Sequence, residues 1–335
     1  MADNILEVSD LKKHFVVRKG IFPGMSEKQN IPAVDGISFS IKKGETLGLV
    51  GESGCGKTTT GKAIMGLNDI TSGAITFNGN QIANLTAKEF KPYRKDIQMI
   101  FQDLDAALNP KMQIGDLIKE AVVVHDPGLS KEEIQQKVLK LLDLVNLKKS
   151  QISNYPTELS GGEKRRVGLA RTLAMEPKFI VADEPTSALD VSIQAQVVNL
   201  LLDLQQKLDL TFLFISHDLP LVELVSHNVG VMYLGKIVEM GPSAKVAKQP
   251  RHPYTAILWS SIVGGDTSRG LKEDARSTAD WQVYDHSSTS RGCKFAPRCP
   301  VFAAKAEPSE CSSVMPVLSD AGDGHLVACH FPLNN

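Results

Sequence analysis

The feature that most constrains the fold is the stretch Gly51–Thr58, which reads Gly-Glu-Ser-Gly-Cys-Gly-Lys-Thr. It fits the pattern G-x-x-x-x-G-K-[ST], a loop whose backbone N–H groups surround nucleotide phosphates. The apolar run 46–50 before it predicts a buried strand, and residues 62–65 after it are compatible with a helix. A loop between a strand and a helix N-terminus binds polyphosphate through its amides and the helix dipole. We therefore expect an α/β domain built around this loop.

Within this loop, we expect Lys57 to neutralise the outer phosphates and the Thr58 hydroxyl to bind Mg²⁺. A chance glycine-rich turn is the alternative, and the strand before the loop and the helix after it argue against it. The remaining loop positions are expected to contact the nucleotide: Gly51, Ser53, Gly54, Cys55, Gly56 and Thr59.

Length and composition fit one large α/β domain with an appendage. The chain has 335 residues, of which 42% are hydrophobic and 22% charged, with a formal net charge of -1. This balance gives no indication of binding to nucleic acid or to an anionic membrane surface. We find neither a secretory signal nor an apolar run long enough to span a bilayer, so any membrane connection is expected to involve a partner protein.

Polar residues follow three apolar runs that predict buried strands. Asp183 and Glu184 follow one, Gln102 a second and His217 a third. Residues at the carboxyl ends of strands face a ligand held at the sheet edge. We expect Asp183 to hold Mg²⁺ through water, Glu184 to polarise an attacking water, Gln102 to reach the metal and water, and His217 to contact a terminal phosphate. A solvated turn and a structural histidine are the alternatives.

A second glycine motif, Leu159–Glu163, precedes a predicted helix and leaves N–H groups open to an anion. The region between the two loops is predicted to be a helical subdomain, covering about 103–165. One nucleotide cannot easily use both loops of one chain across this insertion. A two-chain arrangement, in which Ser160, Gly161 and Gly162 of each chain close over the nucleotide of the other, is therefore expected.

Together these motifs resemble the ATP-binding-cassette (ABC) family over residues 5–250. The resemblance implies an α/β P-loop NTPase (RecA-like) nucleotide-binding domain with an N-terminal antiparallel β subdomain, an inserted helical subdomain and a small cysteine-bearing C-terminal extension. It implies ATP and Mg²⁺ as cofactors, Glu184 as catalytic base, His217 as γ-phosphate sensor and Phe15 as the adenine-stacking residue. Phe15 could instead pack in the core. The family signature usually ends in Gln, but here that position is Glu163.

The chain is also similar to the ATPase subunits of oligopeptide and dipeptide importers, through Phe101–Asp103 with Leu108–Pro110, Arg251–Thr255 and the cysteine-bearing tail. This implies a second ATPase subunit in a heterodimer, two transmembrane permease subunits, an external substrate-binding protein and a peripheral place on the cytoplasmic face of the membrane. Nickel or oligosaccharides are alternative cargoes. A soluble cassette ATPase acting on nucleic acid or ribosomes and a metal-binding regulatory module are alternative classes.

The tail carries four cysteines with the spacing C-x5-C-x11-C-x17-C, namely Cys293, Cys299, Cys311 and Cys329. Four thiols in a cytosolic chain favour metal over disulfides, and four can hold a [4Fe–4S] cluster. We expect such a cluster, with zinc and free or oxidised thiols as alternatives. The predicted domains are 1–263 for the ATP-binding domain, 264–290 for a linker and 291–335 for the extension.

Overall fold

The structure is a computed structural model that describes residues 4–19, 27–102, 108–187, 189–261 and 291–333. The chain divides into two compact units. We call the first the helical unit; it comprises Met1–Ile5, Ile41–Thr46 and Leu85–Ile215. We call the second the phosphate-loop unit; it comprises Leu6–Ser40, Leu47–Asn84 and Ser216–Asn335. The predicted linker 264–290 lies outside the described residues, so the predicted domain division stays a prediction.

The helical unit contains three parallel strands, β6 (Ile97–Ile100), β7 (Phe179–Asp183) and β8 (Thr211–Ile215), with β7 between the other two. Every residue of β7 and β8 is buried. Strands covered on both faces show such continuous apolar runs instead of alternation. Because the strands are parallel and paired in register, their carboxyl ends lie at the same edge of the sheet.

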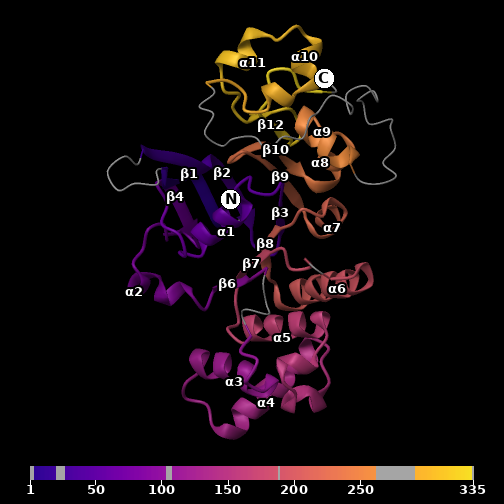
Figure 1. Cartoon of the computed structure of the whole chain (residues 1–335). Helices are drawn as coiled ribbons and strands as arrows, with labels where there is room; N and C mark the ends of the chain where they lie inside the picture. Colours follow the sequence, from indigo (N-terminus) through magenta and orange to yellow (C-terminus); the bar gives the residue numbers. More distant parts are fainter. Residues whose placement is uncertain (1–3, 20–26, 103–107, 188, 262–290, 334–335) are drawn as a thin grey trace. The chain divides into compact units, whose positions relative to one another are not determined.

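Helices make up most of the rest of the helical unit. The helices α3, α4 and α5 pack side by side through buried residues such as Leu117, Val138 and Val167 (Figure 1). Side-chain caps begin α2, α4 and α5, where Thr86, Ser130 and Ser160 each form a capping box with a glutamate three residues later. The helices of this unit are α2 (Ala87–Phe90), α3 (Ile114–His125), α4 (Lys131–Leu144), α5 (Gly161–Leu173) and α6 (Val191–Leu208).

The phosphate-loop unit holds two sets of strands. One set has the order β2-β1-β4-β5 and comprises β1 (Asn4–Lys19), β2 (Glu27–Lys42), β4 (Ser72–Phe77) and β5 (Asn80–Gln81). The other has the order β11-β12-β10-β9-β3 and comprises β3 (Thr46–Val50), β9 (Asn228–Tyr233), β10 (Lys236–Pro242), β11 (Ser319–Asp320) and β12 (Leu326–Val327). The strand β3 is buried and runs parallel to β9, so the chain leaves the sheet at Val50 and enters the glycine-rich loop.

The C-terminal segment, residues 291–333, is part of the core of the phosphate-loop unit. Its strand β12 pairs antiparallel with β10, and Phe295 is 1% exposed against Tyr233 and Tyr254. The helices of the unit are α1 (Lys57–Ile64), α7 (Leu219–Val225), α8 (Ser243–Lys248), α9 (Pro253–Ser260), α10 (Pro300–Ala304) and α11 (Ser309–Ser313).

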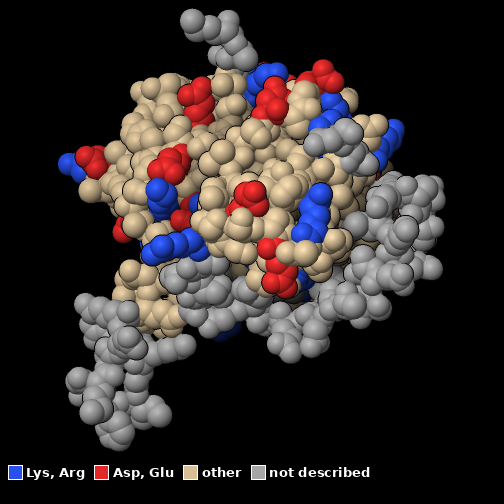
Figure 2. All heavy atoms as spheres, turned by 90° about the horizontal axis from the view of Figure 1, so that it is seen from above, with Lys and Arg blue, Asp and Glu red and all other residues tan. Residues whose placement is uncertain are grey.

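These elements confirm the predicted α/β class. On the face seen in Figure 2, basic and acidic side chains are interspersed among uncharged residues and form no large patch of one sign among the described residues. None of the helices in the described part of the chain combines the length and the apolar character needed to span a bilayer.

Candidate functional site

The glycine-rich loop lies between β3 and α1, as the sequence predicts. Its backbone has positive φ at Gly51 (147°), Gly54 (80°) and Gly56 (113°). A Cβ atom at Gly51 or Gly56 would lie 2.2 Å from a backbone carbonyl oxygen, that of Met232 or Ala33. Only glycine satisfies both the dihedral angle and the space. The loop therefore leads directly into the N-terminus of α1, an arrangement suited to binding an anion.

Lys57 is held within this loop and is 6% exposed. Its ammonium donates hydrogen bonds to the carbonyl oxygens of Gly51 (2.7 Å) and Glu52 (3.0 Å) and lies 3.6 Å from the Cys55 sulfur. Burial raises the pKa of the Cys55 thiol above its usual range. The loop thus holds a positive charge in a fixed position.

The other predicted loop residues lie at or near the surface of the phosphate-loop unit. Ser53 and Gly54 are exposed, and Thr58 and Thr59 are half-buried in the first turn of α1. Phe15 lies in β1 with 39% of its surface exposed, and the Lys13 ammonium is 4.9 Å from its ring centroid. Its exposure argues against the core alternative.

The predicted carboxylates lie in the helical unit at the end of β7. Asp183 is its last residue and is 2% exposed. Glu184 follows with φ of 47°, an uncommon conformation for a residue with a side chain, and its N–H donates to the Ile215 carbonyl at 2.8 Å. The Gln102 side chain donates to the Glu184 carboxylate at 2.8 Å. The structure thus brings Gln102 and Glu184 together at one sheet edge, although they are far apart in sequence.

Arg165, on α5, is a residue that sequence reasoning missed. Its guanidinium donates to the carbonyl oxygens of Phe101 (3.2 Å) and Ser187 (3.0 Å) and to the Ser187 hydroxyl (3.2 Å). It therefore ties the residue before Gln102 to the loop after Glu184. No motif or periodicity in the sequence distinguishes it from the neighbouring basic residues of α5.

The second glycine motif forms the N-terminus of α5, as predicted. Ser160 is the N-cap, and the Glu163 carboxylate accepts from its N–H (2.9 Å) and hydroxyl (2.7 Å). The Gln151 side chain donates to the same carboxylate at 2.7 Å. Hydrogen bonds from Ser160 lower the pKa of Glu163. Glu163 thus completes the capping box of this helix, which a Gln at this position also allows. Gly162 is buried, and a Cβ there would lie 2.6 Å from Ile193.

His217 lies between β8 and α7 and is exposed. The next residue, Asp218, caps α7 by accepting from the Leu221 N–H at 3.2 Å. His217 belongs to the phosphate-loop unit, whereas Glu184 belongs to the helical unit. Its role as a phosphate sensor stays a prediction.

The four C-terminal cysteines line one small cavity, together with His252, Phe295, Phe302, His330 and Phe331 among others. All are free thiols. Burial raises the pKa of each, to about 11 for Cys299 and about 12 for Cys329. A metal requires the thiolate, which this apolar surrounding disfavours. Among the described residues, the cysteine sulfurs do not belong to any set of three or more possible metal ligands whose atoms all lie within 4.8 Å of one another.

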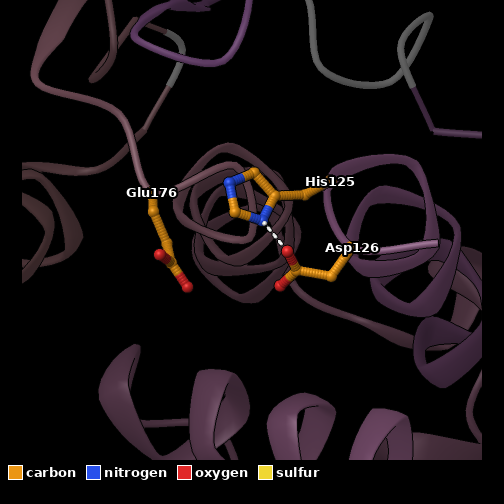
Figure 3. A group of neighbouring side chains, drawn as sticks. All are labelled: His125, Asp126 and Glu176. Atoms are coloured by element: carbon orange, nitrogen blue, oxygen red, sulfur yellow. Dashed lines mark ion pairs between the residues drawn. The ribbon is translucent and has the colours of Figure 1, made fainter. Parts of the chain in front are cut away.

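One group of that kind is formed by His125, Asp126 and Glu176 in the helical unit (Figure 3). The Lys137 ammonium contacts Asp126 at 2.6 Å and Glu176 at 2.8 Å, and the His125 ring nitrogen lies 3.1 Å from Asp126. The Lys137 ammonium therefore already contacts both carboxylates and offsets part of their negative charge. We assign the group a structural role, joining the end of α3 to α4 and to the turn after α5.

Comparison with known proteins places the chain in a family. A family model described as ABC transporter matches residues 34–187, and one described as oligopeptide/dipeptide transporter, C-terminal region, matches residues 238–305. The oligopeptide transport ATP-binding protein AppF of Bacillus subtilis is 45% identical over 98% of this chain and 97% of its own length. The chain belongs to the ABC transporter family, among its ATP-binding proteins. OppF of Salmonella typhimurium, another oligopeptide transport ATP-binding protein, is 43% identical over 97% of this chain and 95% of its own.

Solved structures support the same assignment. The ATP-binding cassette MJ0796, described as a dimer in a post-hydrolysis state bound to ADP and Pi, is 25% identical over 71% of this chain and 98% of its own, with a TM-score of 0.62. CbiO1 from Clostridium perfringens, part of the ABC transporter complex cbiONQ, is 30% identical over 73% of this chain and 90% of its own, also with a TM-score of 0.62. The predicted family and the predicted ATPase class are confirmed.

The predicted [4Fe–4S] cluster is wrong. The chain belongs to a family of ATP-binding transport proteins, and neither the family descriptions nor the names of these relatives refer to an iron–sulfur centre. In the structure the four thiols are free, and burial raises their pKa values, so the protonated form is favoured where no metal is bound. ATP and Mg²⁺ remain the cofactors that the family implies, and the glycine-rich loop with Lys57 and Thr58 fits them.

Proposed function

We propose that this chain is the ATP-hydrolysing subunit of an importer that takes up oligopeptides or dipeptides. The similarity to AppF and OppF over nearly the whole length of both chains carries this proposal. It extends through the C-terminal region, where the matching model is described as that of oligopeptide/dipeptide transporters. That second match favours peptides over nickel, oligosaccharides or a soluble role on nucleic acid.

In this proposal the phosphate-loop residues and the residues at the ends of β6 and β7 have distinct tasks. The loop amides and Lys57 would hold the phosphates, Thr58 and Gln102 would supply oxygen ligands for Mg²⁺, and Asp183 would hold the ion through water. Glu184 accepts a proton from the attacking water, and the hydrogen bond from Gln102 fixes the direction of its carboxylate. Bound Mg²⁺ would neutralise developing charge on the phosphates.

Assembly completes the site. The dimeric cassette MJ0796 supports pairing with a second ATPase subunit, in which the N-terminus of α5 with Ser160–Gly162 would face the partner's nucleotide. We propose two permease subunits in the membrane and an external binding protein as further partners, with this chain peripheral at the cytoplasmic face. A heterodimer, as opposed to two identical chains, is part of the proposal.

Glu184→Gln tests the catalytic assignment. Glutamine keeps the shape but cannot take the proton, so hydrolysis by the assembled complex should fall about 100-fold to 1,000-fold while ATP binding is retained. Glu176→Gln is a matched control, since Glu176 also has positive φ in the helical unit, and its activity should stay within about twofold of wild type. Unchanged turnover in Glu184→Gln would remove Glu184 as the base.

A transport measurement tests the assignment to peptide import. Proteoliposomes containing this chain, its membrane partners and the binding protein should take up a labelled peptide in an ATP-dependent manner. Uptake of nickel or an oligosaccharide, with no uptake of peptide, would contradict the proposed cargo while leaving the ATPase assignment intact.

A further inference from the structure

The phosphate loop of this chain makes a direct contact with the C-terminal segment. Glu52, at a variable position of the motif, receives two hydrogen bonds from the Arg298 guanidinium, at 3.0 Å and 2.8 Å. This is the paired geometry that makes arginine–carboxylate contacts strong and directional. The Arg298 side chain is 13% exposed and the Glu52 side chain 38%. A residue 246 positions further along the chain thus holds the loop.

The backbone of Glu52 is also held by a residue that follows β10 in the sequence. The Glu52 N–H donates to the Tyr254 hydroxyl at 2.9 Å. Tyr254 lies in the first turn of α9 and is 1% exposed. Both the main chain and the side chain of Glu52 are therefore fixed by residues C-terminal to β10.

Arg298 is itself held rigidly by aromatic rings. Its guanidinium carbon lies 5.7 Å from the Tyr233 ring centroid and 5.9 Å from that of Phe295, and one nitrogen donates to the Tyr233 hydroxyl at 3.3 Å. The rings of Tyr233, Tyr254 and Phe295 contact one another at 4.7 to 5.4 Å. Such a setting removes the rotamer freedom that weakens most exposed ion pairs.

The start of α9 is held in place by a buried carboxylate. Glu239, fully buried in β10, accepts hydrogen bonds from the backbone N–H groups of Arg251 (2.7 Å) and His252 (2.8 Å). The same carboxylate contacts His325, also fully buried, at 2.6 Å. The Tyr254 N–H donates to the His252 ring at 3.1 Å. The C-terminal segment therefore fixes Tyr254 as well as Arg298.

Charge gives this contact a consequence for nucleotide binding. Glu52 lies between Gly51 and Ser53, so its carboxylate is a negative charge within the loop that receives a triphosphate. Like charges at short range oppose each other, and the effect grows in a partly desolvated site. A guanidinium at hydrogen-bonding distance cancels that charge, and the hydrogen bond to Glu52 raises the pKa of Arg298 so that it stays protonated.

We propose that Arg298 is a positioning residue for ATP binding: it neutralises Glu52 and holds the phosphate loop in its binding conformation. The C-terminal segment of this chain thereby becomes part of the ATP site through Glu52. The inference rests on the assignment of residues 51–58 as the ATP-binding loop.

Arg298→Gln tests the proposal in the full-length chain within its assembled transporter. The KM for ATP should rise about tenfold, because the uncompensated Glu52 charge opposes the nucleotide in the bound state, while kcat stays within about twofold. The exposed Arg291 in the same segment is a matched control, and Arg291→Gln should leave both constants unchanged.

A double-mutant cycle separates neutralisation of Glu52 from general support of the fold. In Glu52→Gln/Arg298→Gln the KM should return to within about twofold of Glu52→Gln alone, because the charge that needed compensation is gone. If Arg298→Gln yields too little folded protein, Arg298→Lys carries the test, since it keeps the charge and loses the paired geometry; its KM should rise above the wild-type value, but by less than about tenfold.

Three outcomes would overturn the inference. They are an unchanged KM in folded Arg298→Gln, an unchanged KM in Arg298→Lys where that variant carries the test, and a double variant as impaired as Arg298→Gln alone. A wild-type chain that binds no Mg-ATP would instead overturn the proposed function, and this inference with it. Titration of wild type and Lys57→Ala with Mg-ATP before the cycle distinguishes the two failures.

Discussion

The phosphate-loop unit contains two motifs, the glycine-rich loop of residues 51–58 and the four C-terminal cysteines. Residue spacing predicts the structure of the loop better than it predicts the chemistry of the cysteines. The loop is contiguous, and its pattern specifies a backbone shape between a strand and a helix, which the structure has. The cysteines are spread over residues 293–329, and the fold brings them to one cavity. The sequence predicted that the four cysteines share one site, but the iron–sulfur chemistry predicted for that site was wrong. A motif is most informative where the backbone itself makes the site.

The largest effect is expected from a substitution in the glycine-rich loop, and it tests whether backbone shape makes the site. Gly56→Ala puts a Cβ 2.2 Å from the Ala33 carbonyl oxygen at a φ of 113°. Backbone strain of this kind costs about 1–3 kcal/mol before the clash is added, so Mg-ATP affinity should fall at least about 100-fold. Isothermal titration calorimetry measures this.

Gly79→Ala is the matched control, because Gly79 also has positive φ (77°) but nothing lies within 4 Å of the added Cβ. Its ATP affinity should stay within about twofold of wild type. Equal losses in the two variants would mean that the close approach at Gly56 is not what the loop requires.

A smaller effect is expected on the alkylation rate of the C-terminal cysteines. With a pKa of about 11, Cys299 has about 200-fold less thiolate at pH 8 than an ordinary cysteine, and the greater nucleophilicity of a more basic thiolate offsets about tenfold of this. Alkylation should therefore be about 20-fold slower than in the unfolded chain, with burial slowing it further.

The rate should rise as pH increases toward 11, because the folded state keeps the proton that the unfolded state loses near pH 8.5. For the same reason these thiols stabilise the fold below pH 8.5 and lose that contribution as pH rises through 11. Mass spectrometry of iodoacetamide-treated protein measures the rate. Alkylation of Cys299 at pH 8 as fast as in urea would show that the cavity holds a thiolate.

The smallest effect concerns the second glycine motif, which is also contiguous. Glu163→Gln keeps the capping box, so the free energy of unfolding should change by only a few tenths of a kcal/mol. ATP turnover should change by no more than about twofold, because Ser160 and Gln151 already hydrogen-bond the carboxylate. A tenfold rise in turnover would mean that the carboxylate repels the nucleotide of the partner. Urea denaturation and a phosphate-release assay give the two numbers.

The sequence determined those features that depend on local backbone and periodicity. The turn at residues 51–58, the buried runs that became β6, β7 and β8, and the helix that begins at the second glycine motif follow from glycine and apolar runs. Because parallel strands end at one edge, it also indicated that Gln102 and Glu184 lie together, and they are 2.8 Å apart.

Only the tertiary structure decided contacts between distant residues with no pattern of their own. Nothing in the sequence relates Arg298 to Glu52, or Arg165 to Ser187, because a single ion pair or hydrogen bond leaves no periodicity to detect. The same holds for the cysteines, whose protonation depends on the burial that the fold imposes and not on their spacing. Backbone shape is encoded locally, whereas charge pairing and desolvation arise only when distant segments meet.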